Sequence, residues 1–513
     1  MANQRLELTW IGKEEESAVE PRILLHDPTK DYGDPNAENM LIHGDNLLAL
    51  KALEQQFAGQ VKCIYIDPPY NTGAAFEHYD DNLEHSIWLR LMKARLIILR
   101  NLLSKDGFIF VQIDNYEMAY LKVLLDEIFG RNNFVNDIVW KRKGGSVNPR
   151  NKLNNMTDFI LCYARSDASI INPVYTLDDD ETQAYIKERF THTDENGRRY
   201  RLSPIISPTY SATLVYEYKG YNPPPNGWSL SREKMEQFEA EGRLQFPKKK
   251  NQRIQRKQFL DEYKGRPIGN LWTDINVINP MSSERMDFVG QKPESLIERI
   301  LQLATKYGDL VLDSFLGSGT TAAVAHKMGR RWIGIELGDH CYTHCKPRLD
   351  KVIDGEQGGI SKSVNWHGCG GYKFYELAPS LIEKDKYGNP VVSDKYNPAM
   401  LIAAVAKLNG YFFAPDPDVF WKQGHSQDKS YIYVTTTYLD AKTLDSLAAD
   451  VSPMEHLLIC APAFDAGLSL RYENIQVRKI PQSVLDKCEY GVNDYNLNIV
   501  DIPDADEEEY VNA

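Results

Sequence analysis

The chain has 513 residues, a hydrophobic share of 42% and a formal net charge of -13. This length exceeds one ordinary domain and predicts about three. No apolar stretch reaches transmembrane length and residues 1–20 are polar, which predicts a cytoplasmic protein with neither a signal peptide nor a membrane anchor. The 7 cysteines are scattered along the chain, which excludes the disulfide framework of a small secreted protein.

A polar N-terminal arm (residues 1–39) precedes the segment Met40–Leu53, which reads MLIHGDNLLALKAL. This segment predicts a short strand, a turn at Gly44-Asp45-Asn46 and a helix with leucines at helical spacing. Asp45 therefore stands where a strand ends and a helix begins, a position typical of a helix N-cap.

A D-P-P-Y tetrapeptide follows the apolar run Val61–Ile66, which predicts a buried parallel strand. The successive prolines Pro68 and Pro69 stiffen the loop and leave their carbonyl oxygens free to accept hydrogen bonds. The Asp67 carboxylate and the Pro68 carbonyl can then accept both hydrogens of an exocyclic amino group, while the Tyr70 ring stacks on the base that carries it. Such acceptors localise the lone pair of the amino nitrogen and make it nucleophilic.

This tetrapeptide resembles the D/N/S-P-P-Y/F signature of the amino-methyltransferases of DNA. The resemblance implies that Asp67, Pro68, Pro69 and Tyr70 are catalytic and that Asp45 contacts the adenine of the methyl donor. The Asp form is more similar to the adenine-N6 enzymes than to the cytosine-N4 enzymes, which commonly carry Ser there. By itself the tetrapeptide is equally typical of a Pro-Pro turn between a strand and a helix, so a second motif has to decide.

Residues 88–166 predict a helix at Trp88–Leu103 and strands at Phe108–Ile113, Phe134–Trp140 and Phe159–Ala164. Alternating strands and helices are typical of a doubly wound parallel sheet. A basic loop joins the last two strands on the expected active-site side of the sheet. It predicts DNA contacts at Lys141, Arg142, Lys143 and Arg150.

The region Asp167–Leu271 breaks this rhythm and carries much of the basic charge. From Lys141 to Arg266 the sequence has 23 Lys and Arg against 16 Asp and Glu, whereas the remainder has 36 against 56. Lys and Arg suit phosphates, and interleaved Asn, Gln and Arg can read base edges. Two interpretations stay open, a target-recognition domain and a structural insertion whose charges cover a solvated helix face. The first predicts DNA contacts at Lys248, Lys249, Lys250, Arg253, Arg256 and Lys257.

The second motif lies in Asp309–Leu337, where an apolar strand, a glycine turn, a helix and a strand ending in Glu336 follow one another. Glycines let the backbone approach a ligand, and an acid about 20 residues past the turn suits ribose hydroxyls. Thr-Thr after Gly319 disfavours a nucleoside triphosphate, which requires Lys-Ser/Thr there. A dinucleotide stays compatible, because Ala322 can replace the third glycine. S-adenosyl-L-methionine explains this turn and the tetrapeptide together.

The motif order is tetrapeptide, insert, glycine turn, and it resembles the circularly permuted beta class of DNA amino-methyltransferases over roughly Met40–Leu377. The chain looks especially like the modification subunit of type III restriction systems. The resemblance implies S-adenosyl-L-methionine as cofactor, double-stranded DNA as substrate, base flipping, and a homodimer or a separate restriction (helicase-nuclease) subunit as partners. It also implies a set of donor-binding residues: Asp45, Lys292, Pro293, Asp313, Phe315, Gly317, Gly319, Thr320 and Glu336.

A cytosine-N4 methyltransferase, an RNA amino-methyltransferase and a catalytically inactive DNA-binding subunit share most of these motifs and remain alternatives. The recurring pairs His340-Cys341 and His344-Cys345 could suggest a metal cluster, but no other ordered Cys/His pair completes a zinc site, so no metal is expected.

The sequence thus predicts an α/β protein with a doubly wound, mostly parallel, Rossmann-like methyltransferase core. Residues 384–513 predict a small α/β module with an acidic end, serving interaction, dimerisation or structural support. The expected domains are an N-terminal arm (1–39), a catalytic half of the core (40–166), a target-recognition insert (167–271), a donor-binding half (272–383) and the C-terminal domain (384–513).

Overall fold

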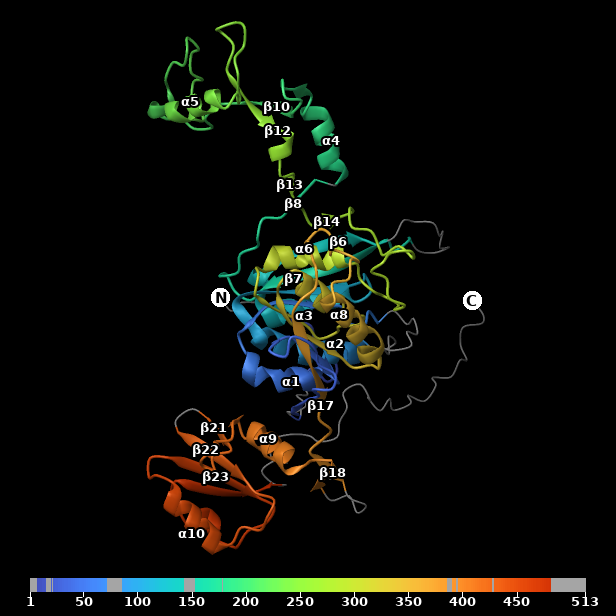
Figure 1. The fold of residues 1–513 in the computed structure, drawn as a ribbon, viewed down its shortest axis with the longest axis vertical. Coiled ribbons are helices and arrows are strands. Elements are labelled where there is room, and N and C mark those ends of the chain that lie inside the picture. Colours follow the sequence, from blue (N-terminus) through green and yellow to red (C-terminus); the bar gives the residue numbers. More distant parts are fainter. Residues whose placement is uncertain are drawn as a thin grey trace, which may run out of the picture. The chain divides into compact units, whose positions relative to one another are not determined.

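The computed structural model describes residues 7–14, 20, 22–71, 85–142, 153–177, 179–384, 390–393, 395–426 and 429–480. The chain divides into two compact units, Met1–Asn172 with Ile275–Ala513, and Pro173–Asp274 (Figure 1). Lys143 and Arg150, predicted to contact DNA, lie outside the described residues. Within the described ranges, no helix is both long and apolar enough to cross a membrane.

A mixed, mostly parallel sheet forms the centre of the first unit, in the strand order β1-β17-β3-β16-β15-β4-β5-β7-β6, with β2 paired to β17. The strands from β17 to β5 run parallel, whereas β1, β7 and β6 are antiparallel to their neighbours. The predicted α/β class is confirmed. The strands are β1 (Leu24–His26), β2 (Tyr32–Gly33), β3 (Met40–His43), β4 (Val61–Ile66), β5 (Leu103–Ile113), β6 (Phe134–Lys141), β7 (Thr157–Ala164), β15 (Leu310–Asp313), β16 (Arg331–Glu336) and β17 (Gly371–Leu377).

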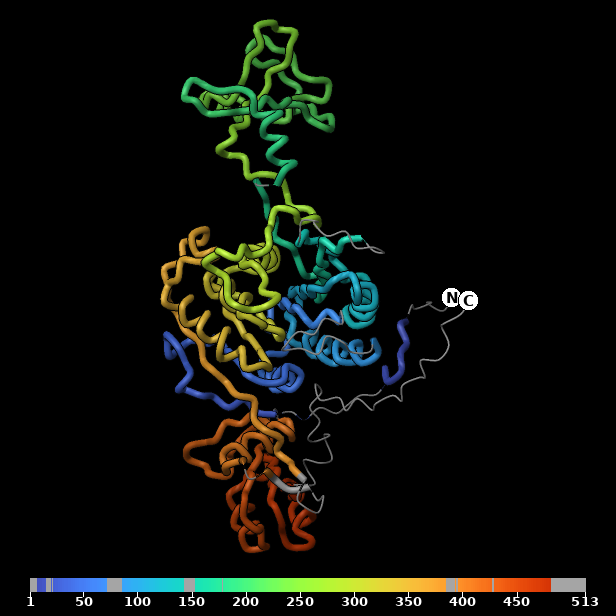
Figure 2. Tube along the Cα trace, turned by 90° about the vertical axis from the view of Figure 1, so that its right-hand side faces the viewer, coloured from blue at the N-terminus to red at the C-terminus, as the bar shows by residue number. Residues whose placement is uncertain are grey.

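Helices cover both faces of this sheet (Figure 2). Side chains alternate along each strand, so Ile64 and Ile66 of β4 pack into a core with the first three helices, while Cys63 and Tyr65 point to the other face. The helix Glu294–Ala304 packs on β4 and β5. The helix Thr320–Lys327 packs on β15 and β16 and lies between Glu294–Ala304 and Lys346–Ile353, contacting both. The helices are α1 (Asn46–Phe57), α2 (His85–Leu102), α3 (Met118–Leu125), α6 (Glu294–Ala304), α7 (Thr320–Lys327) and α8 (Lys346–Ile353).

Part of the expected N-terminal arm belongs to the sheet. Leu24, Leu25 and His26 of β1 pair antiparallel with Leu377, Glu376 and Tyr375 of β17. Three residues are too few to show a strand pattern in the sequence. They form a strand because they pair with β17, which lies far away in the chain.

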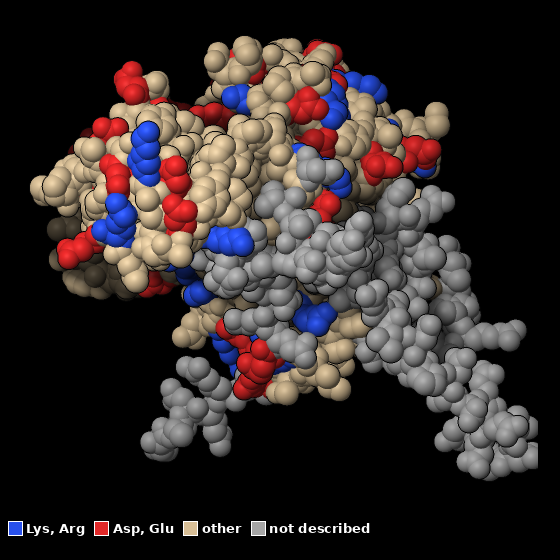
Figure 3. Space-filling model, turned by 90° about the horizontal axis from the view of Figure 1, so that it is seen from below, with Lys and Arg blue, Asp and Glu red and all other residues tan. Residues whose placement is uncertain are grey.

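The segment after β17 folds as a small α/β layer with two apolar clusters, one that includes Val405 and one that includes Leu444, Leu447 and Ile459. Its sheet has the order β20-β21-β22-β23-β24, parallel from β22 to β24. Acidic and basic side chains are interspersed over the face shown in Figure 3. The elements are β18 (Ile382–Lys384), β19 (Pro390–Val392), α9 (Pro398–Leu408), β20 (Phe412–Phe413), β21 (Gly424–His425), β22 (Ser430–Val434), α10 (Ala441–Asp450), β23 (His456–Ala461) and β24 (Ile475–Lys479).

The second unit, Pro173–Asp274, holds an antiparallel sheet in the order β11-β12-β10-β9 and a core around Trp228, Met235 and Ile254. The sequence placed an insert at 167–271, and its role in recognition stays a prediction. The elements are β8 (Tyr175–Thr176), α4 (Asp180–Arg189), β9 (His192–Thr193), β10 (Arg199–Pro204), α5 (Arg232–Ala240), β11 (Leu244–Gln245), β12 (Gln255–Phe259), β13 (Arg266–Pro267) and β14 (Leu271–Trp272).

Candidate active site

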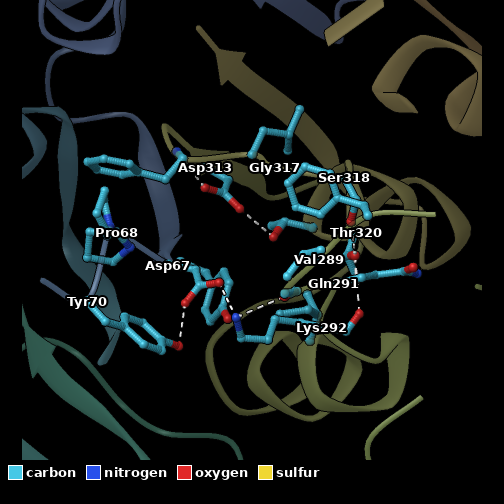
Figure 4. Close-up of a pocket in the computed structure, with 18 of the residues that line it drawn as sticks. Asp67, Pro68, Tyr70, Val289, Gln291, Lys292, Asp313, Gly317, Ser318 and Thr320 are labelled. Atoms are coloured by element: carbon cyan, nitrogen blue, oxygen red, sulfur yellow. Dashed lines mark hydrogen bonds and ion pairs between the residues drawn. The ribbon is translucent and has the colours of Figure 1, made fainter. Parts of the chain in front are cut away.

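A cavity of about 400 Å³ lies where β4 and β15 end. Parallel neighbouring strands bring their carboxyl ends to one sheet edge, so the tetrapeptide after β4 and the glycine turn after β15 face the same space, although they are far apart in sequence. The loop before α6 closes the third side (Figure 4). The cavity is lined by Tyr65, Asp67, Pro68, Pro69, Tyr70, Asp287, Phe288, Val289, Gly290, Gln291, Lys292, Ile297, Asp313, Phe315, Leu316, Gly317, Ser318, Thr320 and Thr321.

Both carboxylate oxygens of Asp67 have partners. The Tyr70 hydroxyl donates to Oδ1 at 2.7 Å, and the Lys292 ammonium donates to Oδ2 (Figure 4). The Pro69 carbonyl accepts from the Trp88 indole at 2.8 Å, which fixes the loop to α2. Pro68, whose carbonyl is predicted to accept from an amino group, lines the cavity.

A second carboxylate that the sequence analysis missed lies beside this loop. Asp158 of β7 is fully buried, accepts from the Gln112 amide at 3.0 Å, and lies 3.4 Å from the Tyr70 hydroxyl. The Tyr65 hydroxyl donates to the same Gln112 at 2.6 Å. Burial raises the pKa of Asp158, while Lys292 and Arg142 lower it. The sequence does contain a signal for this contact. Gln112 and Asp158 are the polar residues of the apolar segments FIFVQI and DFILCYA, and buried polar groups need hydrogen-bond partners.

The glycine turn adopts a conformation that requires glycine. Gly317 and Gly319 have φ of +57° and +84°, and a Cβ at Gly317 would lie 3.4 Å from the Phe288 ring at the cavity wall. The Asp313 carboxylate stabilises the turn from below, because it accepts from the Phe315 amide at 2.9 Å and the Thr321 hydroxyl at 2.6 Å. Burial raises the pKa of Asp313 to about 7.

Four of the residues predicted to bind the donor do not line the cavity: Asp45, Pro293, Gly319 and Glu336. Glu336 is buried and accepts from the Gly317 amide at 2.6 Å, so it braces the turn from behind. Asp45 caps α1 by accepting from the Leu48 amide at 3.1 Å. The donor contacts predicted for these two residues stay predictions.

Asn46, next to that cap, connects the Gly-Asp-Asn turn to the loop after β15. Its amide donates to the Ser314 carbonyl at 2.7 Å and accepts from the buried Arg95 at 2.5 Å. The second polar residue of the Gly-Asp-Asn turn therefore supports the loop that follows β15, a role that only the parallel strand arrangement creates.

The side chains predicted to contact DNA differ in how exposed they are and in whether they already have a partner in the protein. In the first unit, Lys141 is exposed and Arg142 pairs with Asp158 at 3.3 Å. In the second unit, Lys250 lies over the Tyr221 ring at 3.8 Å and donates to the Lys219 carbonyl at 2.7 Å. Lys248, Lys249 and Arg253 are exposed, while Arg256 and Lys257 on β12 are half-buried.

The His/Cys pairs after β16 take part in packing. His340 lies 2.8 Å from the Glu336 carboxylate, and the Cys345 thiol donates to the Gly317 carbonyl at 2.9 Å. Among the described residues, no group of three His, Cys, Asp or Glu side chains could hold a metal ion.

Comparison with known proteins matches a family model described as DNA methylase (N6_N4_Mtase) to residues 61–346. The chain is 38% identical over 412 residues to the "Probable type III restriction-modification enzyme HindVI Mod subunit" of Haemophilus influenzae, covering 67% of this chain and 54% of that protein. It is 36% identical over 308 residues to "Type II methyltransferase M.EcaI" of Enterobacter cloacae, covering 58% and 66%. It is 30% identical over 362 residues to "Type III restriction-modification enzyme StyLTI Mod subunit" of Salmonella typhimurium, covering 62% and 55%.

The matched parts span about half to two thirds of the length of these relatives. The family match contains both the tetrapeptide and the glycine turn and covers more than half of the 513 residues. The resemblance inferred from the motifs is confirmed: this chain belongs to the DNA methylase family.

Proposed function

We propose that the protein transfers a methyl group from S-adenosyl-L-methionine to the N6 amino group of adenine in double-stranded DNA, at a specific sequence. The observation that carries the proposal is the convergence of the D-P-P-Y loop and the glycine turn on one cavity. The names of the relatives, two of them Mod subunits, support a role as the modification component of a restriction system. We place this work in the cytoplasm.

The residues around the cavity fit S-adenosyl-L-methionine. About 400 Å³ falls within the range of roughly 300–1,000 Å³ that is usual for ligand pockets. Phe288 and Phe315 offer apolar rings to an adenine, and Gly317 lets a ligand approach the backbone. Asp67 and Asp313 also line the cavity, and a carboxylate there would offset the positive charge of a sulfonium.

The chain's own residues prepare the nucleophile. Tyr70 stacks on an adenine rotated out of the duplex, and the Asp67 carboxylate and Pro68 carbonyl accept from its amino group. When bound, S-adenosyl-L-methionine supplies an electrophilic methyl carbon, whose bond to sulfur breaks with the electron pair staying on sulfur as N6 bonds to the carbon. The amino group loses one proton in this reaction, and Asp67 is placed to accept it.

The first experiment incubates the purified protein with methyl-labelled S-adenosyl-L-methionine and mixed-sequence duplex DNA, then digests the DNA to nucleosides for mass analysis. Methyl on adenine N6 is the expected result. Methyl on cytosine N4 would keep the proposed mechanism but change the target base to cytosine. Transfer only to RNA would change the proposed substrate from DNA to RNA. Absence of both transfer and donor binding would overturn the proposal.

The test variant is Asp67→Ala, which removes both acceptor oxygens of the side chain. We expect kcat to fall at least about a hundredfold, because the amino group loses its acceptor where charge develops. Donor binding, measured by calorimetry, should change little. Normal turnover by this variant would exclude Asp67 from the chemistry.

The relatives' names and the Mod-like motif order support a restriction subunit as a partner, and the homodimer is carried over from the family resemblance. We propose a homodimer that works with a separate restriction subunit, and we place DNA recognition in the unit Pro173–Asp274. Light scattering of the purified chain, with and without duplex DNA, tests the dimer.

A further inference from the structure

The ammonium of Lys292 contacts the carboxylate at the centre of the proposed reaction. It donates to Asp67 Oδ2 and also to the Gly290 carbonyl at 3.1 Å (Figure 4). The lysine side chain is only 12% exposed and that of Asp67 22%. A lysine held by two acceptors and sheltered from water is a fixed part of the site, unlike a surface ion pair.

The backbone around Lys292 fixes where its side chain starts. Pro293 forms the N-cap of α6 with φ of -68°, and the Lys292 carbonyl accepts from the Thr320 hydroxyl at 3.2 Å. Thr320 is the first residue of α7, directly after the glycine turn. Lys292 therefore contacts the residue after the glycine turn through its backbone carbonyl and the tetrapeptide through its side chain.

The charges in the cavity explain why a cation is needed there. Among the described residues that line it, Lys292 is the only Lys or Arg, whereas Asp67, Asp287 and Asp313 are acidic. Asp158 adds a buried carboxylate behind Tyr70, and Lys292 lowers its pKa against the effect of burial. Neighbouring carboxylates disfavour each other's ionisation, and a cation between them offsets that repulsion.

The two oxygens of Asp67 differ in the kind of partner they hold. The partner of Oδ2 is a charged lysine on a constrained backbone. The partner of Oδ1 is the hydroxyl of Tyr70, a residue of the same loop whose ring is expected to stack on the target base. The hydroxyl is a hydrogen-bond donor, as an amino group is, so it occupies Oδ1 as a stand-in for the adenine N6 group.

We propose that Lys292 is a positioning residue for methyl transfer: it holds Asp67 through Oδ2 and thereby presents Oδ1 to the target amino group, which displaces the Tyr70 hydroxyl. The inference rests on the proposed function and deepens it. It differs from the role that the family resemblance implies for Lys292, namely donor binding.

The test separates chemistry from donor binding in Lys292→Met, which keeps the length of the side chain and removes its charge. Calorimetry gives the Kd for S-adenosyl-L-methionine, and initial rates on duplex DNA give kcat and KM. We expect kcat at saturating donor to fall about 10- to 100-fold, as for a misplaced catalytic group, with the donor Kd changed less than about threefold. Lys292→Arg, which keeps a cation, should recover part of kcat.

A second variant tests the stand-in role of the tyrosine. Tyr70→Phe keeps the stacking ring and leaves Oδ1 without its internal donor. We expect the KM for DNA to stay equal or fall, because the amino group no longer competes with a hydroxyl for Oδ1. A rise in the KM for DNA would overturn this half of the inference.

Lys346→Met is the matched control, because Lys346 also pairs with a carboxylate, Asp350 at 3.0 Å, but does not line the cavity. It should leave all three constants unchanged. If Lys292→Met raises the donor Kd and leaves kcat at saturating donor at the wild-type value, the lysine serves the donor and the inference is wrong. Should the methionine variant not fold, Lys292→Gln, which also removes the charge, decides by the same comparison of kcat and Kd.

The outcomes also separate this inference from the proposed function. A wild-type protein that transfers no methyl group contradicts the function itself. A wild-type protein that methylates adenine while Lys292→Met does so at the same rate contradicts only the positioning role.

Discussion

Asp313 shows how one buried carboxyl couples the glycine turn to pH. Its side chain is 3% exposed, and two hydrogen bonds to the turn do not compensate for lost hydration. Burial therefore raises its pKa to about 7. In the unfolded chain an Asp titrates near pH 4.

This difference predicts a stability that depends on pH with a defined sign. Between about pH 4 and pH 7 the folded chain binds a proton at Asp313 that the unfolded chain does not, so stability falls as pH rises, by at most about 1.4 kcal/mol per pH unit. Asp313→Asn has no group that titrates at this position, so its stability relative to that of the wild type should rise as the pH rises from about 4 to about 7. Thermal unfolding of both proteins at pH 5 and pH 8 measures the gain; parallel shifts would contradict it.

Glu336 acts on the same turn from the opposite side. Its carboxylate accepts from the Gly317 amide and, at 2.8 Å, from the Leu337 amide. Glu336→Ala should raise the donor Kd about 10- to 100-fold, because a charged acceptor that holds the turn is worth about 1.5–3 kcal/mol and the predicted ribose contact is lost as well. Calorimetry with Glu38→Ala as a surface control measures this change, and an unaltered Kd would remove Glu336 from donor binding.

At the scale of elements, a buried ion network joins the helices behind the cavity. Glu294 of α6 accepts from Lys327 of α7 at 2.9 Å and from Arg348 of α8 at 2.9 Å, and the side chains of Glu294 and Lys327 are fully buried. Gly359 makes room for it, since a Cβ there would come within 2.1 Å of Glu294. These ion pairs hold Glu294, the first residue of α6, and so fix the backbone two residues after Lys292.

Removing one partner of this network should be costly. Lys327→Met leaves Glu294 as a buried charge with one cation fewer, for which a loss of about 3–5 kcal/mol of unfolding free energy is expected. The control is Glu38→Gln, which breaks the exposed pair with Arg331 and should cost less than about 1 kcal/mol. Urea unfolding compares the two variants, and equal losses would show that the network adds no more than a surface pair.

At the scale of the molecule, the two compact units divide the proposed work, with the cavity in one and most predicted DNA contacts in the other. Exposed cations in the second unit suit phosphates. Arg198, in contrast, is committed to Asp261 at 2.7 Å and Glu262 at 2.9 Å.

Single changes Lys248→Ala, Lys249→Ala and Arg253→Ala should each weaken DNA binding and make the negative slope of log K against log salt shallower by about one. The donor Kd should not change, because the cavity lies wholly in the first unit. Fluorescence anisotropy at several salt concentrations measures the slope, with Arg198→Ala as the control. A slope equal to that of wild type in all three variants would place the DNA contacts elsewhere.

The local patterns of the sequence were sufficient for the main strands and for both motifs. Val61–Ile66 and Trp332–Ile335 are apolar because parallel strands are buried on both faces, and the prolines and glycines mark loops whose backbone they restrict or free. The sequence also predicted that Asp67 and Gly317 face one ligand, since strand ends in a doubly wound sheet share an edge.

Only the tertiary structure decided which side chains meet. The pairing of Lys292 with Asp67, the burial of Asp158 beside Tyr70 and the addition of β1 to β17 join residues that are far apart in the chain. Side-chain partners at such separations depend on the packing of the whole sheet, and no local period or spacing encodes them. The sequence by itself determined the family and the motifs that predict the reacting groups; the fold determined how the Asp67 carboxylate is held.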